Sequence, residues 1–136
     1  MSKPPARVAA AYDALPAKLR TYLLSLRTMI LKVAADDPRV GPVTETLKWG
    51  QPAYLTEATK SGTTIRLGFS KKSPDIAMLF VHCQTSLVGQ WRDLYDDILS
   101  FEGNRAILLD LGKPRPDAPL RHCIAMALTY HSNKSA

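Results

Sequence analysis

The segment Lys48-Trp49-Gly50-Gln51-Pro52-Ala53-Tyr54 identifies the fold more specifically than any other part of the chain. It places two large aromatic residues and two residues with special backbone properties within seven positions. Gly50 has no Cβ atom and Pro52 has no amide proton, so an ordinary central strand would not contain both. We therefore expect one strand over about Thr46 to Leu55 that bulges or lies at a sheet edge.

Two more strands are expected directly after this segment. From about Thr63 to Ser70, apolar and polar residues alternate, as they do in a strand with one buried face. Across Ile76 to Cys83 both alternating sets are mostly apolar, which indicates an inner strand. The connections, which include Ser61-Gly62 and residues 71–75, are short, and short hairpin connections require antiparallel pairing.

Helices are expected before and after these strands. A short helix runs through residues 8–12, and a longer amphipathic helix begins at about Pro16 and ends near Asp36-Asp37-Pro38. A later helix, a strand over about Arg105 to Leu111 and a last helix capped by Asp117 complete the pattern. The apolar face of the later helix consists of Leu87, Trp91, Leu94 and Ile98.

The order helix, helix, three strands, helix, strand, helix (ααβββαβα) predicts the α+β class. We expect a single compact domain over residues 1–136, with an antiparallel sheet of about four to five strands packed against the helices. The 46% hydrophobic and 22% charged content is that of a globular protein with a real core.

Several features of the chain resemble one known family when they are taken together. They are a helix with the pattern Leu23-x-x-Leu26-Arg27-x-x-Ile30, the segment Glu45 to Tyr54, the turn Phe69-Ser70-Lys71-Lys72, and the late strand and helix. Together they resemble the YdhG-like family of small bacterial domains of unknown function. The most specific part is Trp-Gly-x-Pro-x-Tyr after Glu-Thr-x-Lys. The resemblance implies a compact α+β domain with an antiparallel sheet, loosely similar to frataxin, and it implies no established enzymatic activity.

Targeting and redox signals predict a cytosolic protein. The N-terminus is polar and lacks an apolar h-region, and no segment has about eighteen uninterrupted apolar residues, so we expect no membrane insertion. Cys83 and Cys123 lie in apolar segments, unlike the dense cysteine framework of a small secreted domain. This pattern predicts reduced, buried thiols.

The net charge of +6 favours anionic partners in general, but the pattern of charge is not specific for nucleic acid. The 18 lysines and arginines are scattered, and the longest basic run is Lys71-Lys72. A soluble basic surface explains this composition. We therefore do not expect nucleic acid as the main partner, and weak association with it is our third hypothesis.

Catalytic motifs are absent from the sequence. It contains no Gly-x-Ser-x-Gly elbow, no local cysteine and histidine pair with an orienting acid, and no glycine-rich phosphate loop. We therefore expect a non-enzymatic protein.

The segment that identifies the fold also contains the best candidate binding site. Two aromatic rings around Gly50 could form the floor of a pocket, or they could be core residues that pack the sheet against the long helix. We favour the core for Trp49, whereas Gln51 and Tyr54 are the better ligand-binding candidates. Basic residues of the neighbouring strands could add an anion contact: Lys48, Arg66 and Lys71.

The leading hypothesis from these residues is a binding domain for a small ligand or a protein partner, without a cofactor. Its site would comprise Lys48, Trp49, Gln51, Tyr54 and Arg66. The inner strand, which is apolar on both faces, also leaves a homodimer open.

A frataxin-like iron-binding chaperone is the second hypothesis, because some relatives in the resembling family are discussed in that role. Iron requires hard oxygen ligands, and Asp93, Asp96 and Asp97 lie at helical spacing with Glu102 nearby. The alternative is the solvated outer face of an amphipathic helix. The positive net charge departs from the acidic character expected of such an iron donor.

A zinc site is a weaker alternative. His82-Cys83, His122-Cys123 and His131 supply suitable ligand types, but adjacent residues on a strand point to opposite faces and so cannot easily bind one ion. We expect core thiols beside partly buried imidazoles instead.

Overall fold

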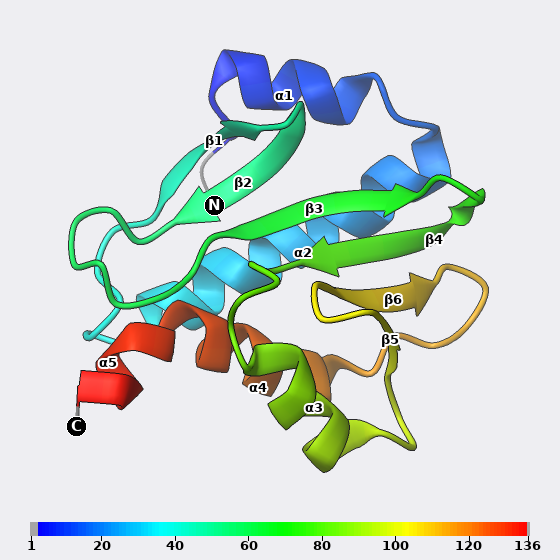
Figure 1. Cartoon of the computed structure of the whole chain (residues 1–136). Coiled ribbons are helices and arrows are strands. Elements are labelled where there is room, and N and C mark those ends of the chain that lie inside the picture. Colours follow the sequence, from blue (N-terminus) through cyan, green and yellow to red (C-terminus); the bar gives the residue numbers. More distant parts are fainter. Residues whose placement is uncertain (1–2, 136) are drawn as a thin grey trace.

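Six strands form one open antiparallel sheet, and helices pack against one of its faces (Figure 1). The computed structural model describes residues 3–135, and residues 1–2 and 136 lie outside the described part. The elements are α1 (Ala6–Asp13), α2 (Ala17–Ala35), β1 (Thr44–Lys48), β2 (Gln51–Leu55), β3 (Ile65–Ser70), β4 (Ser73–Phe80), α3 (Leu87–Tyr95), β5 (Ser100–Glu102), β6 (Ala106–Asp110), α4 (Asp117–Leu128) and α5 (Tyr130–Ser135).

The expected α+β class and the antiparallel pairing of consecutive strands are confirmed. The strand order is β1-β2-β3-β4-β6-β5, so β4 is an inner strand as expected. The prediction of about four to five strands and the order ααβββαβα are wrong, because residues 3–135 form six strands and five helices. The three-residue β5 is too short to show an alternating pattern, and α5 follows α4 after a single residue.

The expected single strand from Thr46 to Leu55 is in fact a hairpin. Trp49 and Gly50 have φ angles of 56° and 74°, and Lys48 pairs with Gln51 across them. Positive φ at both central residues is the signature of the two-residue type I′ turn, whose twist matches that of the flanking strands. Gly50 therefore makes a turn rather than a bulge.

Pro52 limits how far this hairpin pairs with the rest of the sheet. The two residues that flank a two-residue turn form a hydrogen-bonded pair, so the amide of Gln51 faces β1 and the next position faces β3. Pro52 has no amide proton to donate there. Consistent with this, the β2–β3 register covers only Ala53 with Arg66 and Tyr54 with Ile65.

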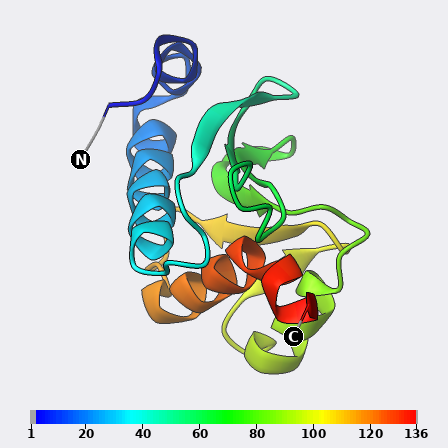
Figure 2. The same ribbon diagram turned by 90° about the vertical axis from the view of Figure 1, so that its left-hand side faces the viewer.

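The hydrophobic core lies between the sheet and the helices, with α1 and α2 on one side of the strands in Figure 2. Ile65 and Leu67 of β3 and Leu79 of β4 are fully buried in it. Full burial of each such side chain contributes about 1.5–3 kcal/mol. The face of α2 that packs on them has helical spacing, and Ala34 rather than Val33 is its last buried residue: Leu19, Leu23, Leu26, Ile30 and Ala34.

The apolar face predicted for the later helix is only half correct. Leu87 and Trp91 are buried, but Leu94 and Ile98 are 52% and 54% exposed. Helix α3 ends at Tyr95, so Ile98 lies beyond the regular helical spacing. None of the helices in residues 3–135 combines the length and apolar character needed to cross a bilayer.

A chain of buried polar side chains ties the N-terminal helices to the hairpin. Arg27 of α2 donates to both carboxylate oxygens of Glu45 on β1, at 2.5 and 2.9 Å. The Tyr54 hydroxyl donates to Glu45 at 2.8 Å and lies 2.5 Å from the Tyr12 hydroxyl of α1. Arg27 is only 5% exposed, so its charge is stabilised by this carboxylate rather than by water.

We expect Glu45→Ala to lower the free energy of unfolding by about 3–5 kcal/mol, because it leaves the buried Arg27 charge without its carboxylate. Asp36→Ala is the matched control, since it breaks the exposed Lys32–Asp36 pair and should cost less than about 1 kcal/mol. Urea unfolding measures both values, and equal losses would contradict the proposed importance of the buried pair.

Alkaline pH should destabilise the fold through the two buried tyrosines. Burial, followed by nearby charge, raises the pKa of Tyr12 to about 12, and burial also raises the pKa of Tyr54. A raised pKa means that the folded state holds the proton more tightly, so this stability is complete below about pH 10 and is lost as the pH rises toward 12.

Each tyrosine should contribute a slope of about 1.4 kcal/mol per pH unit over that window. Tyr12→Phe should flatten the decline in unfolding free energy above pH 10, as measured by urea unfolding at successive pH values. An unchanged slope in the variant would show that Tyr12 is not responsible.

Candidate functional site

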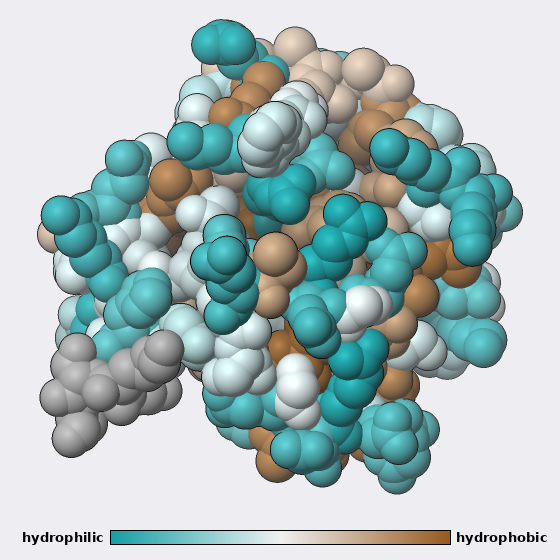
Figure 3. All heavy atoms as spheres, viewed as in Figure 1, coloured by the Kyte–Doolittle hydropathy of each residue, from teal (hydrophilic) through white to brown (hydrophobic). Residues whose placement is uncertain are grey.

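The face of the sheet opposite the helices is the candidate functional surface, and we call it the open face. In the view of Figure 1, no helix of the described residues passes in front of β2, β3 and β4. Side chains that alternate with the core residues point toward this side. A small apolar cluster forms at its centre, separate from the main core: Met78, Phe80, Ala106 and Leu108. Figure 3 shows this face, where apolar residues are surrounded by hydrophilic ones.

A hollow of about 330 Å³ lies on the open face. Its charged lining consists of four cations and one carboxylate. The complete lining is Gln51, Arg66, Phe69, Ser70, Lys71, Lys72, Met78, Phe80, Glu102 and Arg105. The carboxylate, Glu102, accepts a hydrogen bond from Arg105 at 2.9 Å, so it does not neutralise the other cations.

Arg66 is the central cation of the hollow and is half-buried. Its Nη1 donates to the amide oxygen of Gln51 at 2.6 Å, and its guanidinium lies 4.9 Å from the centre of the Phe80 ring. Arg105 approaches the same ring at 5.5 Å. Among residues 3–135 Arg66 has no carboxylate within ion-pair distance.

The environment of Arg66 disfavours its positive charge. Burial lowers its pKa from the ordinary value, and the neighbouring Arg105 charge lowers it further. A bound anion would remove both disadvantages, because it would replace lost hydration and screen the repulsion between the two guanidinium groups. Arginine forms bidentate hydrogen bonds to carboxylates and phosphates, so either group fits the hollow chemically.

Gly68 allows Gln51 to reach Arg66. A Cβ atom at Gly68 would lie 2.5 Å from the Gln51 side-chain nitrogen, which is closer than real contacts allow. The Gln51 side chain therefore crosses over β3 at Gly68, where the absence of a Cβ atom leaves room for it. This contact holds the amide oxygen of Gln51 against the Arg66 guanidinium.

The structure brings Gln51 and Arg66 together but separates Tyr54 from them. Tyr54 is fully buried and faces the core, so its interpretation as a ligand-binding residue is not supported. The physical reason is the two-residue period of a strand, which puts positions three apart on opposite faces. Lys48 pairs with Gln51, is exposed and shares the open face, although it does not line the hollow.

Trp49 lies at the tip of the hairpin, and the interpretation that it is a core residue is wrong. Its side chain is 89% exposed. It also has a positive φ, a conformation in which Asn, Asp and Gly are strongly preferred over large aromatic residues. The aromatic ring therefore contributes nothing to the core and occupies a position unsuited to it.

The three aspartates of the iron hypothesis are not gathered into a site. Asp93 lies on α3, but Asp96 and Asp97 follow the end of that helix, and all three are exposed. Within the described part of the chain, no group of three or more histidine, cysteine or acidic side chains could hold a metal ion. Iron binding stays a prediction that no arrangement of these residues supports.

The two cysteines differ in environment. Cys123 is buried as expected, and burial raises the pKa of its thiol to about 12. Cys83 is exposed, so its expected burial is wrong, because β4 ends at Phe80 and Cys83 lies in the following turn. The expected partial burial of the imidazoles is wrong, because His82, His122 and His131 are exposed. The Nδ1 atom of His122 lies 2.5 Å from the Tyr95 hydroxyl.

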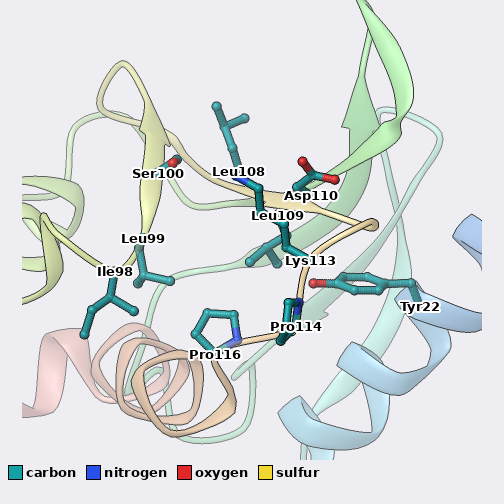
Figure 4. A pocket seen from close by; sticks show the side chains of 10 residues that line it. All are labelled: Tyr22, Ile98, Leu99, Ser100, Leu108, Leu109, Asp110, Lys113, Pro114 and Pro116. Carbon is teal, nitrogen blue, oxygen red and sulfur yellow. The ribbon is translucent and has the colours of Figure 1, made fainter.

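A second, smaller cavity of about 130 Å³ lies between α2, the β5–β6 hairpin and the loop before α4 (Figure 4). Tyr22, Ser100, Asp110 and Lys113 supply its polar groups. Its two charges have opposite sign, so this cavity lacks the uncompensated charge of the hollow on the open face.

Several residues of the hollow could not be identified from the sequence: Phe80, Arg105, Met78 and Lys72. The alternating pattern predicts that Phe80 and Met78 share a face of their strand, but it does not show that helices leave this face open. Arg105 precedes its strand by one residue, and the sheet order brings it beside Phe80. Only the pairing of β4 with β6 reveals that neighbour.

Comparisons of the chain with family models, curated proteins and solved structures find no match. The resemblance to the YdhG-like family stays a prediction.

Replacing Trp49 with Asn should raise the free energy of unfolding by a few tenths to about 1 kcal/mol, because Asn-Gly is the preferred sequence of a type I′ turn. Gly50→Ala is the opposite test and should destabilise by about 1 kcal/mol, since alanine disfavours positive φ. Urea unfolding of the two variants checks the turn, and destabilisation by Trp49→Asn would indicate that Trp49 packs against the fold.

Proposed function

We propose that this chain is a cytosolic, non-enzymatic binding domain whose site for an anionic ligand or partner is the hollow around Arg66. The observation that carries the proposal is the half-buried guanidinium of Arg66, which Gln51 and Phe80 orient while no carboxylate of the described residues compensates it. A cation that is held in place without an ion pair favours binding of an external anion.

The other groups of the hollow suit binding. Phe80 and Met78 provide an apolar floor, while Lys71 and Lys72 add exposed positive charges at the β3–β4 turn. The Ser70 hydroxyl accepts a hydrogen bond from the backbone amide of Lys72 and so helps to shape that turn. A phosphate or carboxylate above Arg66 would meet cations on more than one side.

Thermal unfolding in the presence of inorganic phosphate and pyrophosphate tests the proposal. Both anions should raise the Tm of the protein beyond the effect of sodium chloride at equal ionic strength, because a ligand that binds only the folded state stabilises it. Arg66→Gln should weaken the apparent affinity about tenfold or more, since it removes the oriented cation.

Arg121→Gln is the matched control, because Arg121 is an exposed arginine on α4 and its loss changes the net charge equally. Anions also stabilise proteins without specific binding, so the difference between these two variants is the decisive quantity. Equal responses of Arg66→Gln and Arg121→Gln would refute the site. Arg105→Gln provides a second lining variant if Arg66→Gln does not fold.

A further inference from the structure

The cationic and aromatic character of the open face extends beyond the hollow. Lys48 projects on the same face from β1, next to Gln51, and Lys71 and Lys72 lie at the β3–β4 turn. The exposed aromatic ring of Trp49 stands at the same end of the sheet, at the tip of the β1–β2 hairpin, with an exposed fraction of 89%. Phe69 is also exposed, but it pairs with the core residue Ala77 and so belongs to the other face of β3. We infer that the anionic partner of this face is single-stranded nucleic acid, an inference that rests on the proposed function.

The shape of the site favours a polymer over a small molecule. Binding sites for small ligands normally bury about 70–90% of the ligand surface. The hollow lies instead on a sheet face that no helix of the described residues covers (Figures 1 and 3). A small anion there would contact only the cations nearest to it, whereas an extended chain of phosphates could contact several cations across the face at once.

The combination of side chains matches the chemistry of single strands. Proteins that bind them without sequence preference combine a cationic track for the phosphates with aromatic rings on which unpaired bases stack. Here Arg66, Lys71, Lys72 and Arg105 would contact phosphates, and Trp49 offers its ring to a base. A duplex fits less well, because the open face carries no helix to enter a major groove and a duplex hides its base faces.

The conformation of Trp49 is an independent argument for contact with a partner. A large aromatic residue stands at a positive φ, fully in solvent, where Asn would make a better turn. An observed backbone outlier of this kind points to a function that outweighs local stability. Stacking with a base would use the exposed ring directly.

Charges that are scattered in the sequence are gathered by the sheet. Lys48, Arg66 and Arg105 come from β1, β3 and the residue before β6, and they are far apart along the chain. Asp93 and Asp96 belong to α3 and its end, and Glu102, the one carboxylate of the hollow, is paired with Arg105. The weak basic signal of the sequence therefore becomes a concentrated one on the open face.

Fluorescence anisotropy with labelled single-stranded DNA and RNA of about twelve nucleotides tests the inference. This length lies within the range of about 4–16 nucleotides that a single binding domain covers. Binding by the wild-type protein should weaken steeply with salt. The logarithm of the binding constant should fall linearly with the logarithm of the salt concentration, with a slope of about −0.7 for each contacted phosphate. Arg66→Gln should weaken binding about tenfold and reduce that slope, whereas Arg121→Gln should leave the slope unchanged.

Tryptophan fluorescence gives a direct readout of stacking. The chain has two tryptophans, of which Trp49 is exposed and Trp91 is fully buried. Single strands should quench the emission of the wild-type protein, and Trp49→Asn should abolish the quenching because only Trp91 remains. The same variant should bind single strands about fivefold or more weakly, although it forms a more stable turn.

Four outcomes would overturn the inference. They are no binding of single strands at low salt, equal binding of a duplex of the same sequence, tighter binding to vesicles that contain phosphatidylserine, and an unchanged salt slope in Arg66→Gln. If phosphate and pyrophosphate still stabilise the protein through Arg66, the proposed anion site survives and only the nucleic acid is wrong. If no anion acts through Arg66, both proposals fail.

Discussion

The buried ion pair between Arg27 and Glu45, extended by Tyr54 and Tyr12, is the interaction on which the N-terminal half of the structure depends. Each of its four members comes from a different element, namely α2, β1, β2 and α1. The β1–β2 hairpin needs this anchor, because Pro52 restricts its pairing with β3 to two residue pairs. Polar contacts with α1 and α2 thus hold in place a hairpin that backbone pairing alone would hold weakly.

The one-sided packing of the helices has a consequence for the other face of the sheet. Its apolar centre is too small to act as a second core, and arginines cover it by stacking on Phe80. Guanidinium groups are well suited to this arrangement, since they are weakly hydrated and planar. The same stacking brings Arg66 and Arg105 close enough to repel one another. The contact of both arginines with Phe80 therefore covers the apolar cluster and also favours binding of an anion.

The hairpin turn contrasts with the buried chain beneath it. Glu45 and Tyr54 are placed so that every hydrogen-bonding group has a partner, whereas Trp49 at the tip has almost no contact with the fold. Gly50 adopts the positive φ of the turn without strain, whereas Trp49 adopts a positive φ that large side chains disfavour. Within one hairpin, Glu45 and Tyr54 therefore serve the stability of the fold, whereas Trp49 at the tip is available to a partner.

The sequence alone was sufficient for the α+β class, the long helix from Pro16 and the inner strand, because these depend on local periodicity and on proline and glycine. It also identified Gln51, as a member of the segment with the two aromatic residues, and Arg66, as a basic residue of a neighbouring strand. Strand pairing decided the rest. Whether Trp49 and Gly50 form a bulge or a turn, and whether Arg105 lies beside Phe80, depends on which strands become neighbours, and that follows from contacts between residues far apart in the chain.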